Sequence, residues 1–174
     1  MNETLQAMTI LKWFIGPAQL ETMGRNAQRG EEREFFRDKL CALADLVSKM
    51  PKTYEQDGKG DAALVGLHYF AGGRASWWIT EKDAGSVNDP AGVNPQHQAF
   101  GLADLFGDGG ELGYISIAEI LENGGELDLY FTPKTLAEAM DTTLNGVSMK
   151  DRIFAGCARD SKNFQDRAAE VCGA

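Results

Sequence analysis

Residues 64–80 read LVGLHYFAGGRASWWIT, two apolar and aromatic runs joined by a short connection that contains two glycines. The runs at 64–70 and 76–80 are rich in the aromatic and β-branched side chains that favour strands. A short glycine-containing connection allows two adjacent strands to pair antiparallel. The stretch therefore predicts a β-hairpin.

Further strands are expected after this hairpin. Residues 99–106 predict a third strand, and the glycine-rich turn at 107–110 leads into a fourth strand around 112–115. Residues 127–131 have the composition of another strand. We therefore expect one mainly antiparallel sheet over residues 64–131.

Two capping boxes mark the starts of short helices. Ser116 and Glu119 have the spacing in which the serine side chain accepts a free backbone N–H and the glutamate reaches back. The first helix is expected to end at Glu122, before an Asn-Gly-Gly stop. Thr135 and Glu138 repeat the spacing, so a second helix should open there.

The chain before the hairpin has helical periodicity. Residues 18–28 predict a short helix, and residues 31–50 predict a longer one that begins with three glutamates and ends before Pro51. Apolar residues recur on one face of the longer helix, which we expect to pack on the sheet. This stripe consists of Phe36, Leu40, Leu43 and Val47.

These elements predict an α+β fold in which N-terminal helices pack on a small, mainly antiparallel β-sheet, followed by a helical C-terminal tail. The length of 174 residues favours a single domain over 1–174. Its parts are a helical N-terminal segment (1–50), an acidic β-rich core (61–131) and the helical tail (132–174). The loop at 82–96 has no periodicity, and we expect it to be exposed and mobile.

The acidic charge is concentrated in the middle of the chain. Residues 61–131 hold eleven Asp and Glu against Arg74 and Lys82, whereas the flanking sections are each neutral, so the middle section carries the net charge of −9. Such a charge repels phosphate backbones and attracts basic surfaces, which predicts a basic protein or nucleoprotein partner and no direct nucleic-acid binding. The alternative is that acidity only keeps a small protein in solution.

The candidate partner-binding residues come from this acidic section and from one aromatic residue. Turns and a short helix should expose several of its carboxylates, and strand alternation sends the adjacent Trp77 and Trp78 to opposite faces, so that one of them is available for contact. The candidates are Asp104, Asp108, Glu111, Glu122, Glu126, Asp128 and Trp77.

No chemical motif predicts a reaction or a cofactor. The chain lacks a Walker-type phosphate loop, a GxSxG elbow, an HExxH pair and an EF-hand pattern. Its two histidines, His68 and His97, could bind a metal only with carboxylates such as Glu81, Asp104 or Glu111, and the spacing is not diagnostic. We expect His68 to pack in the sheet, His97 to lie on the surface, and no metal or cofactor to be bound.

The N-terminal apolar stretch does not predict a membrane segment. Residues 8–15 are interrupted by Lys12 and are far shorter than the roughly 20 residues that a bilayer crossing needs. Glu3 precedes the run, where a secretory signal would carry basic residues. The three cysteines form no CxxC pair and are expected to be reduced thiols. We therefore expect a cytoplasmic protein.

Several phrases of the sequence resemble a known family. They are TYEQDGKGD, LHYF, SWWITEKD, QAFGLADLFGDGGELGYISIAEI and ELDLYFTPKTLAE. Together they resemble an uncharacterised bacterial family, a domain of unknown function carried on plasmids, phages and integrative elements, whose signature combines ELGYISI with DLYF. The resemblance covers about residues 50–140. It implies a location on mobile DNA, and the family offers no established catalytic residues.

The resemblance and the charge together suggest a function by analogy. Small acidic proteins of mobile elements resemble anti-restriction and anti-CRISPR inhibitors, whose carboxylates compete with DNA for basic grooves. We expect a non-enzymatic, protein-binding inhibitor of host defence that acts on a basic nucleic-acid-binding surface. The alternatives are an adaptor in plasmid maintenance or conjugation and a small metal-dependent enzyme.

Overall fold

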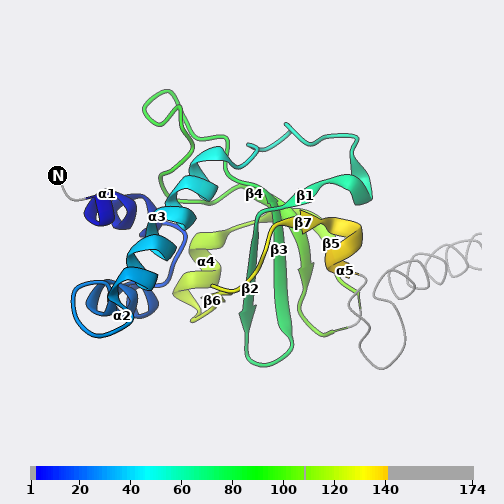
Figure 1. Ribbon diagram of the computed structural model, residues 1–174. Helices are drawn as coiled ribbons and strands as arrows, with labels where there is room; N and C mark the ends of the chain where they lie inside the picture. Colours follow the sequence, from blue (N-terminus) through cyan, green and yellow to red (C-terminus); the bar gives the residue numbers. More distant parts are fainter. Residues whose placement is uncertain (1–2, 108, 141–174) are drawn as a thin grey trace, which may run out of the picture.

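The computed structural model describes residues 3–107 and 109–140, and its fold is α+β, as the sequence predicts. Three helices gather at one end of a β-sheet (Figure 1). The helices are α1 (Glu3–Leu11), α2 (Pro17–Asn26), α3 (Arg33–Lys49), the 3-10 helix η1 (Gly60–Ala62), α4 (Ile117–Glu122) and α5 (Leu136–Met140). The strands are β1 (Leu64–Val65), β2 (Leu67–Ala71), β3 (Ala75–Glu81), β4 (Ala99–Asp104), β5 (Glu111–Ile115), β6 (Glu126–Leu127) and β7 (Lys134–Thr135).

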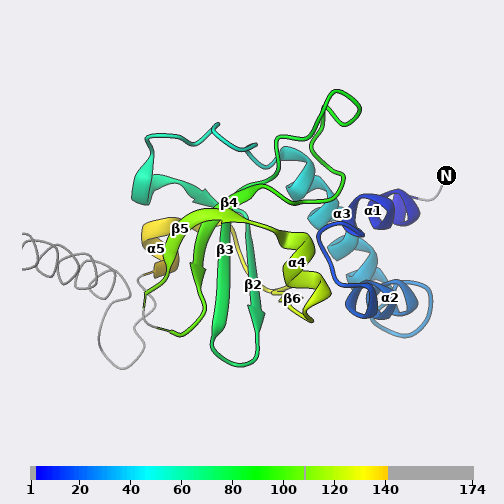
Figure 2. The same cartoon turned by 180° about the vertical axis from the view of Figure 1, so that it is seen from behind.

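The main sheet has five antiparallel strands in the order β5-β4-β3-β2-β6. The predicted hairpin is confirmed: in β2 and β3, Leu67 lies opposite Ile79 and Ala71 opposite Ala75. Both glycines of the connection, Gly72 and Gly73, have positive φ, the conformation that a tight hairpin turn needs. Figure 2 shows β5 along the edge of the sheet farthest from α1, α2 and α3.

The first predicted strand is broken at Gly66, which corrects the prediction of one continuous strand over 64–70. β1 leaves the main sheet and pairs antiparallel with β7 in a separate two-stranded sheet, while β2 stays in the hairpin. A Cβ atom at Gly66 would lie 2.9 Å from the Met50 sulfur, so a larger residue there would require the Met50 side chain to shift. The contact between distant residues could not be read from local periodicity.

The N-terminal helices share one buried core with the sheet. Leu40, Leu43 and Val47 of the predicted stripe are buried on α3, while Phe36 is half-buried at its margin. α3 packs most extensively on α1, and both contribute to the cluster that contains the sheet residues. The Tyr69 hydroxyl also donates a hydrogen bond of 2.7 Å to the carbonyl of Phe14.

The opposite face of the sheet has a smaller core beneath α5. Val65, Trp78 and Leu102 are buried there against Leu136 and Met140. Trp77 packs against the larger core on the other face, so the predicted opposition of the two tryptophans is confirmed.

Both predicted capping sites open helices. The backbone N–H of Glu119 donates to the Ser116 hydroxyl at 3.2 Å, and α4 ends at Glu122 as expected. The Thr135 hydroxyl accepts from the backbone N–H of Glu138, whose carboxylate accepts in return from the Thr135 backbone. The strand expected over 127–131 shortens to β6, because a turn follows in which the Phe131 N–H donates to the Asp128 carbonyl at 3.3 Å. The helices expected beyond residue 140 lie outside the described residues.

The loop at 82–96 was predicted to be exposed and mobile; most of its residues are exposed, but the prediction of exposure is wrong at three buried polar residues that anchor the loop. Lys82, Asp89 and Gln96 are buried, although many of the residues between them are exposed. The Lys82 ammonium donates hydrogen bonds to the carbonyls of Val47 and Ser48, at 2.8 and 3.0 Å, at the end of α3. Burial is the main cause that lowers the pKa of Lys82 below its ordinary value. The loop therefore fastens the sheet to the helices through side chains that have no periodic spacing.

Across the described ranges, no helix has both the length and the apolar character that a bilayer crossing requires.

Candidate functional site

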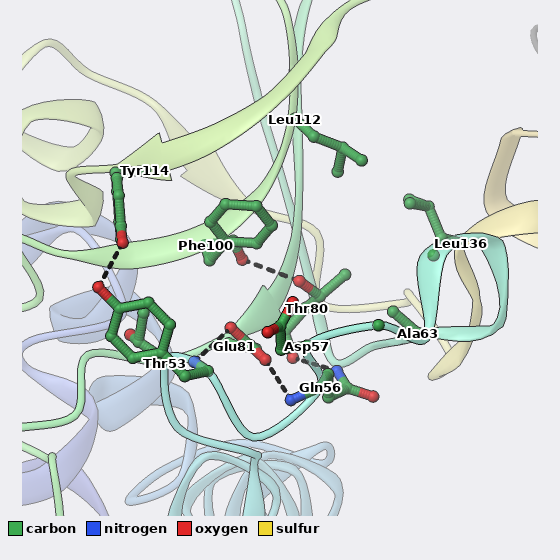
Figure 3. Close-up of a pocket in the computed structure, with 13 residues that line it drawn as sticks. Thr53, Gln56, Asp57, Ala63, Thr80, Glu81, Phe100, Leu112, Tyr114 and Leu136 are labelled. Atoms are coloured by element: carbon green, nitrogen blue, oxygen red, sulfur yellow. Dashed lines mark hydrogen bonds between the residues drawn. The ribbon is translucent and has the colours of Figure 1, made fainter.

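A pocket of about 510 Å³ opens between the segment 53–63 and the β3–β5 side of the sheet (Figure 3). It lies on the face that α5 covers, and Leu136 of α5 closes one end. Its lining consists of Thr53, Tyr54, Gln56, Asp57, Gly58, Gly60, Ala63, Thr80, Glu81, Phe100, Leu112, Tyr114 and Leu136.

Glu81 forms the base of the pocket. The residue is 4 % exposed, and its carboxylate accepts hydrogen bonds from the backbone N–H groups of Tyr54, at 2.9 Å, and Gln56. The register of β3 on β4 shifts between Ile79 and Glu81, the kind of irregularity that redirects a side chain at the end of a strand. Within the described residues Glu81 forms no ion pair with Lys or Arg.

The side chain of Gln56 joins the segment 53–63, which forms one wall of the pocket, to β1 and β3 through hydrogen bonds. Its amide nitrogen donates to the carbonyls of Leu64 and Thr80, at 2.9 and 2.8 Å, and its oxygen accepts from the Leu64 N–H at 2.8 Å. A buried amide whose hydrogen bonds are satisfied holds a segment in one conformation. The pocket wall is therefore pre-formed even though it is an irregular segment.

Tyr54 is held in an unusual backbone conformation. Its φ is +78°, and it is the one non-glycine residue of the described chain with a positive φ. This conformation costs a bulky residue about 1–3 kcal/mol and persists where surrounding contacts impose it. The hydrogen bond from its N–H to Glu81 is such a contact, and the residue is 71 % exposed at the pocket mouth.

Three aromatic rings line the mouth. The hydroxyls of Tyr54 and Tyr114 are 2.5 Å apart and share a hydrogen bond. The Tyr114 ring meets Tyr54 and Phe100 edge to face, with ring centroids 6.4 and 5.7 Å apart. The hydrogen bond between Tyr114 and Tyr54 is the main cause that raises the pKa of Tyr114 above its ordinary value. Tyr114 therefore remains neutral at physiological pH.

The lining has the chemistry of a cation site. It contains the carboxylates of Glu81 and Asp57 and three aromatic rings, and it contains no lysine, arginine or histidine. Ring faces and carboxylates both attract a positively charged group. The same residues lack a cysteine or histidine that could act as a nucleophile or a base near neutral pH.

Asp104 is not available to a partner, which corrects its place among the candidate contacts. The residue is 1 % exposed, and its carboxylate accepts backbone N–H groups of Phe106, Gly107 and Gly109 at 3.2, 2.6 and 3.2 Å. Its charge therefore holds the turn between β4 and β5.

The Asp128 carboxylate is also partly occupied by contacts within the protein. It is half-buried, lies 3.2 Å from the His68 Nδ1 atom and accepts the N–H of Tyr130 at 2.9 Å. The ring of His68 stacks on Trp78 with centroids 5.1 Å apart, as a packed sheet residue should, while His97 is exposed. No group of three or more potential metal ligands occurs in the described ranges.

The structure does not bring the other acidic candidates together. Glu111, Glu122 and Glu126 are exposed, but Glu111 lies on β5 and Glu126 on β6, the two opposite edges of the sheet. Trp77 is half-buried and packs on the larger core. Asp108 lies outside the described residues.

No motif or periodic pattern in the sequence selects the pocket residues as a group. The sequence indicates Glu81 as a possible metal ligand or, paired with Asp83, as a possible acid–base group, and it gives no reason to select Tyr54 or Tyr114. A signal was nevertheless present, because the phrases TYEQDGKGD, SWWITEKD, QAFGLADLFGDGGELGYISIAEI and ELDLYFTPKTLAE supply every lining residue except Ala63. These four phrases thus meet at this pocket.

In comparisons with known proteins, no family model, no curated protein and no solved structure matches the chain.

Proposed function

We propose that the chain is a non-enzymatic binding protein that takes a basic side chain of a partner protein into the pocket formed by Tyr54, Phe100, Tyr114, Asp57 and Glu81. The observation that carries the proposal is a buried carboxylate at the base of an aromatic pocket whose lining contains no positive charge. A bound lysine or arginine would supply the missing cation.

The charge of the whole core supports a basic partner. Residues 61–131 contain eleven acidic and two basic residues, and one of the two, Lys82, directs its ammonium group to the end of α3. The resulting field attracts a basic surface and speeds its approach. In line with the family resemblance, we propose that this surface is the nucleic-acid-binding groove of a cytoplasmic host defence protein, of the CRISPR or restriction type, and that the chain inhibits it by competing with DNA.

Titration with a minimal ligand tests the pocket. In NMR titrations of the full chain, N-acetylarginine amide should shift the resonances of the pocket residues, whereas the neutral isostere N-acetylcitrulline amide should not. Tyr54→Leu should weaken arginine binding about 2- to 30-fold, the equivalent of the 0.5–2 kcal/mol of one cation–π contact.

The matched control is Tyr130→Leu, which removes another exposed tyrosine, 81 % exposed, that does not line the pocket. It should bind arginine as the parent does. Equal binding of the citrulline compound, or unchanged affinity in Tyr54→Leu, would refute the pocket as a cation site.

Capture from host lysate tests the identity of the partner. The immobilised full chain should retain a basic nucleic-acid-binding protein, Tyr54→Leu should retain less of it, and added duplex DNA should release it. A captured protein that DNA does not displace would contradict competition for a DNA-binding groove, even if the arginine titration succeeds.

A further inference from the structure

β5 offers an unpaired strand edge beside the pocket. In the described part of the chain it pairs only with β4, at one end of the five-stranded order. In an antiparallel pair the N–H and C=O groups of alternate residues point away from the neighbour, so one row of β5 groups is open to another strand. Its sequence, ELGYI, contains neither the proline nor the lysine that often blocks such edges.

Two pockets flank this edge, one on each face of the sheet. The aromatic pocket lies on the Trp78 face and is lined by Leu112 and Tyr114. A second pocket, of about 380 Å³, lies on the Trp77 face between the sheet and α4, and Tyr114 borders it too. The side chains of an added strand alternate between the two faces, so they could enter both pockets.

The second pocket matches the first in the sign of its charge. It is lined by Trp77, Leu105 and Ile120 with the exposed carboxylate of Glu119, and it contains no basic residue. Glu111 is also exposed, at the start of β5. A segment that lies along β5 therefore meets carboxylates on both sides.

We infer that the partner is recognised as an extended basic segment that adds antiparallel to β5, with a basic side chain entering the aromatic pocket and an apolar side chain facing Trp77. This inference rests on the proposed function, because it specifies how the basic side chain is presented. Charge complementarity favours this occupant over a second copy of the chain, since two copies, each with a net charge of −9, repel one another.

The test uses an acetylated and amidated heptapeptide, Thr-Arg-Val-Arg-Val-Arg-Thr, and two isomers that each carry one N-methyl group. One isomer is methylated on the central arginine amide and the other on the following valine amide. Adjacent residues of a strand direct their N–H groups to opposite edges, so each methyl group blocks one edge of the peptide. The isomers have the same composition and charge.

Binding to the full chain is measured by calorimetry, and exchange of the β5 amides is followed by NMR. Addition to β5 predicts that one isomer binds at least about tenfold more weakly than the other, because only one edge of the peptide faces the strand. It also predicts slower exchange of alternate β5 amides in the complex.

Three outcomes would overturn strand addition: equal affinity of the two isomers, unchanged exchange in β5, or no binding of the parent peptide at millimolar concentration. A concentration-dependent dimer that the peptide does not dissociate would assign the edge to a second copy. None of these results tests whether the aromatic pocket binds a cation, which the arginine titration tests separately. If arginine binds and the isomers do not differ, the pocket is retained and only strand addition is rejected.

Discussion

Tyr69→Phe should be less stable than the parent protein near neutral pH. The difference between the two free energies of unfolding should become smaller at alkaline pH. The Tyr69 ring is fully buried, and its hydroxyl donates a 2.7 Å hydrogen bond to the carbonyl of Phe14, which joins the sheet to the segment after α1. Removing the hydroxyl leaves that carbonyl without the hydrogen bond, at a cost of about 1–3 kcal/mol in the free energy of unfolding at pH 8.

The pH dependence follows from burial of the hydroxyl. Burial raises the pKa of Tyr69 far above its ordinary value of 10.0, so the native state keeps the proton where the unfolded chain has lost it. A raised native pKa gives stability that is fully present below the unfolded pKa and is lost as pH rises above it. At pH 11 the loss is about 1.4 kcal/mol. The phenylalanine variant has no hydroxyl to titrate and lacks this loss. The stability gap, meaning the difference in free energy of unfolding between the parent and the variant, should therefore narrow by about 1.4 kcal/mol between pH 8 and pH 11.

Urea unfolding of the parent and the variant at both pH values measures the gap directly. Other titrating groups, including Lys82 and Tyr114, are present in both chains and largely cancel in the difference. Tyr130→Phe, at an exposed ring, is the control and should leave the gap near zero at both pH values. A Tyr69→Phe variant as stable as the parent at pH 8, or a gap that stays constant to pH 11, would refute the reasoning.

Three further perturbations test the fold and the charge. Leu43→Ala, at an 8 % exposed position of α3, should cost about 2–5 kcal/mol by leaving a cavity, and unchanged stability in a melting curve would reject the helix packing. Asp104→Ala should lower stability by about 1–3 kcal/mol, because backbone N–H groups of the following turn, including that of the buried Gly109, lose their acceptor. An unchanged free energy of unfolding in urea would contradict that role. Reversing Glu111 to lysine should weaken binding of a basic peptide more than reversing Glu126, since only Glu111 lies on the β5 edge. Both losses of affinity should become smaller as the salt concentration rises. Equal losses of affinity in the two variants would indicate a diffuse electrostatic field and no localised site.

Local sequence signals predicted the elements that depend on near neighbours. The Gly72-Gly73 connection, the capping spacing of Ser116 with Glu119 and the apolar stripe on α3 involve residues a few positions apart. Backbone sterics and the 3.6-residue repeat act over that range, so one sequence is sufficient to find them. The same signals placed Trp77 and Trp78 on opposite faces of the sheet.

The candidate site could not be predicted in this way, because its residues are far apart in the chain. Glu81 became a pocket base only through the N–H groups of Tyr54 and Gln56, and Tyr114 reached Tyr54 from a different strand. Acidic residues are common in a chain of net charge −9, so composition cannot distinguish a carboxylate that faces solvent from one buried in a turn.

The sequence by itself determined the hairpin, the helices α2 to α5 and the concentration of negative charge in the core, because these depend on local conformation and on composition. It did not predict α1 or the pairing of β1 with β7. Tertiary structure alone decided which carboxylates are accessible, where the strand breaks at Gly66 against Met50, and which aromatic rings meet at the pocket. These properties depend on contacts between residues distant in sequence. Such contacts form only when the buried core fixes how the segments lie against one another.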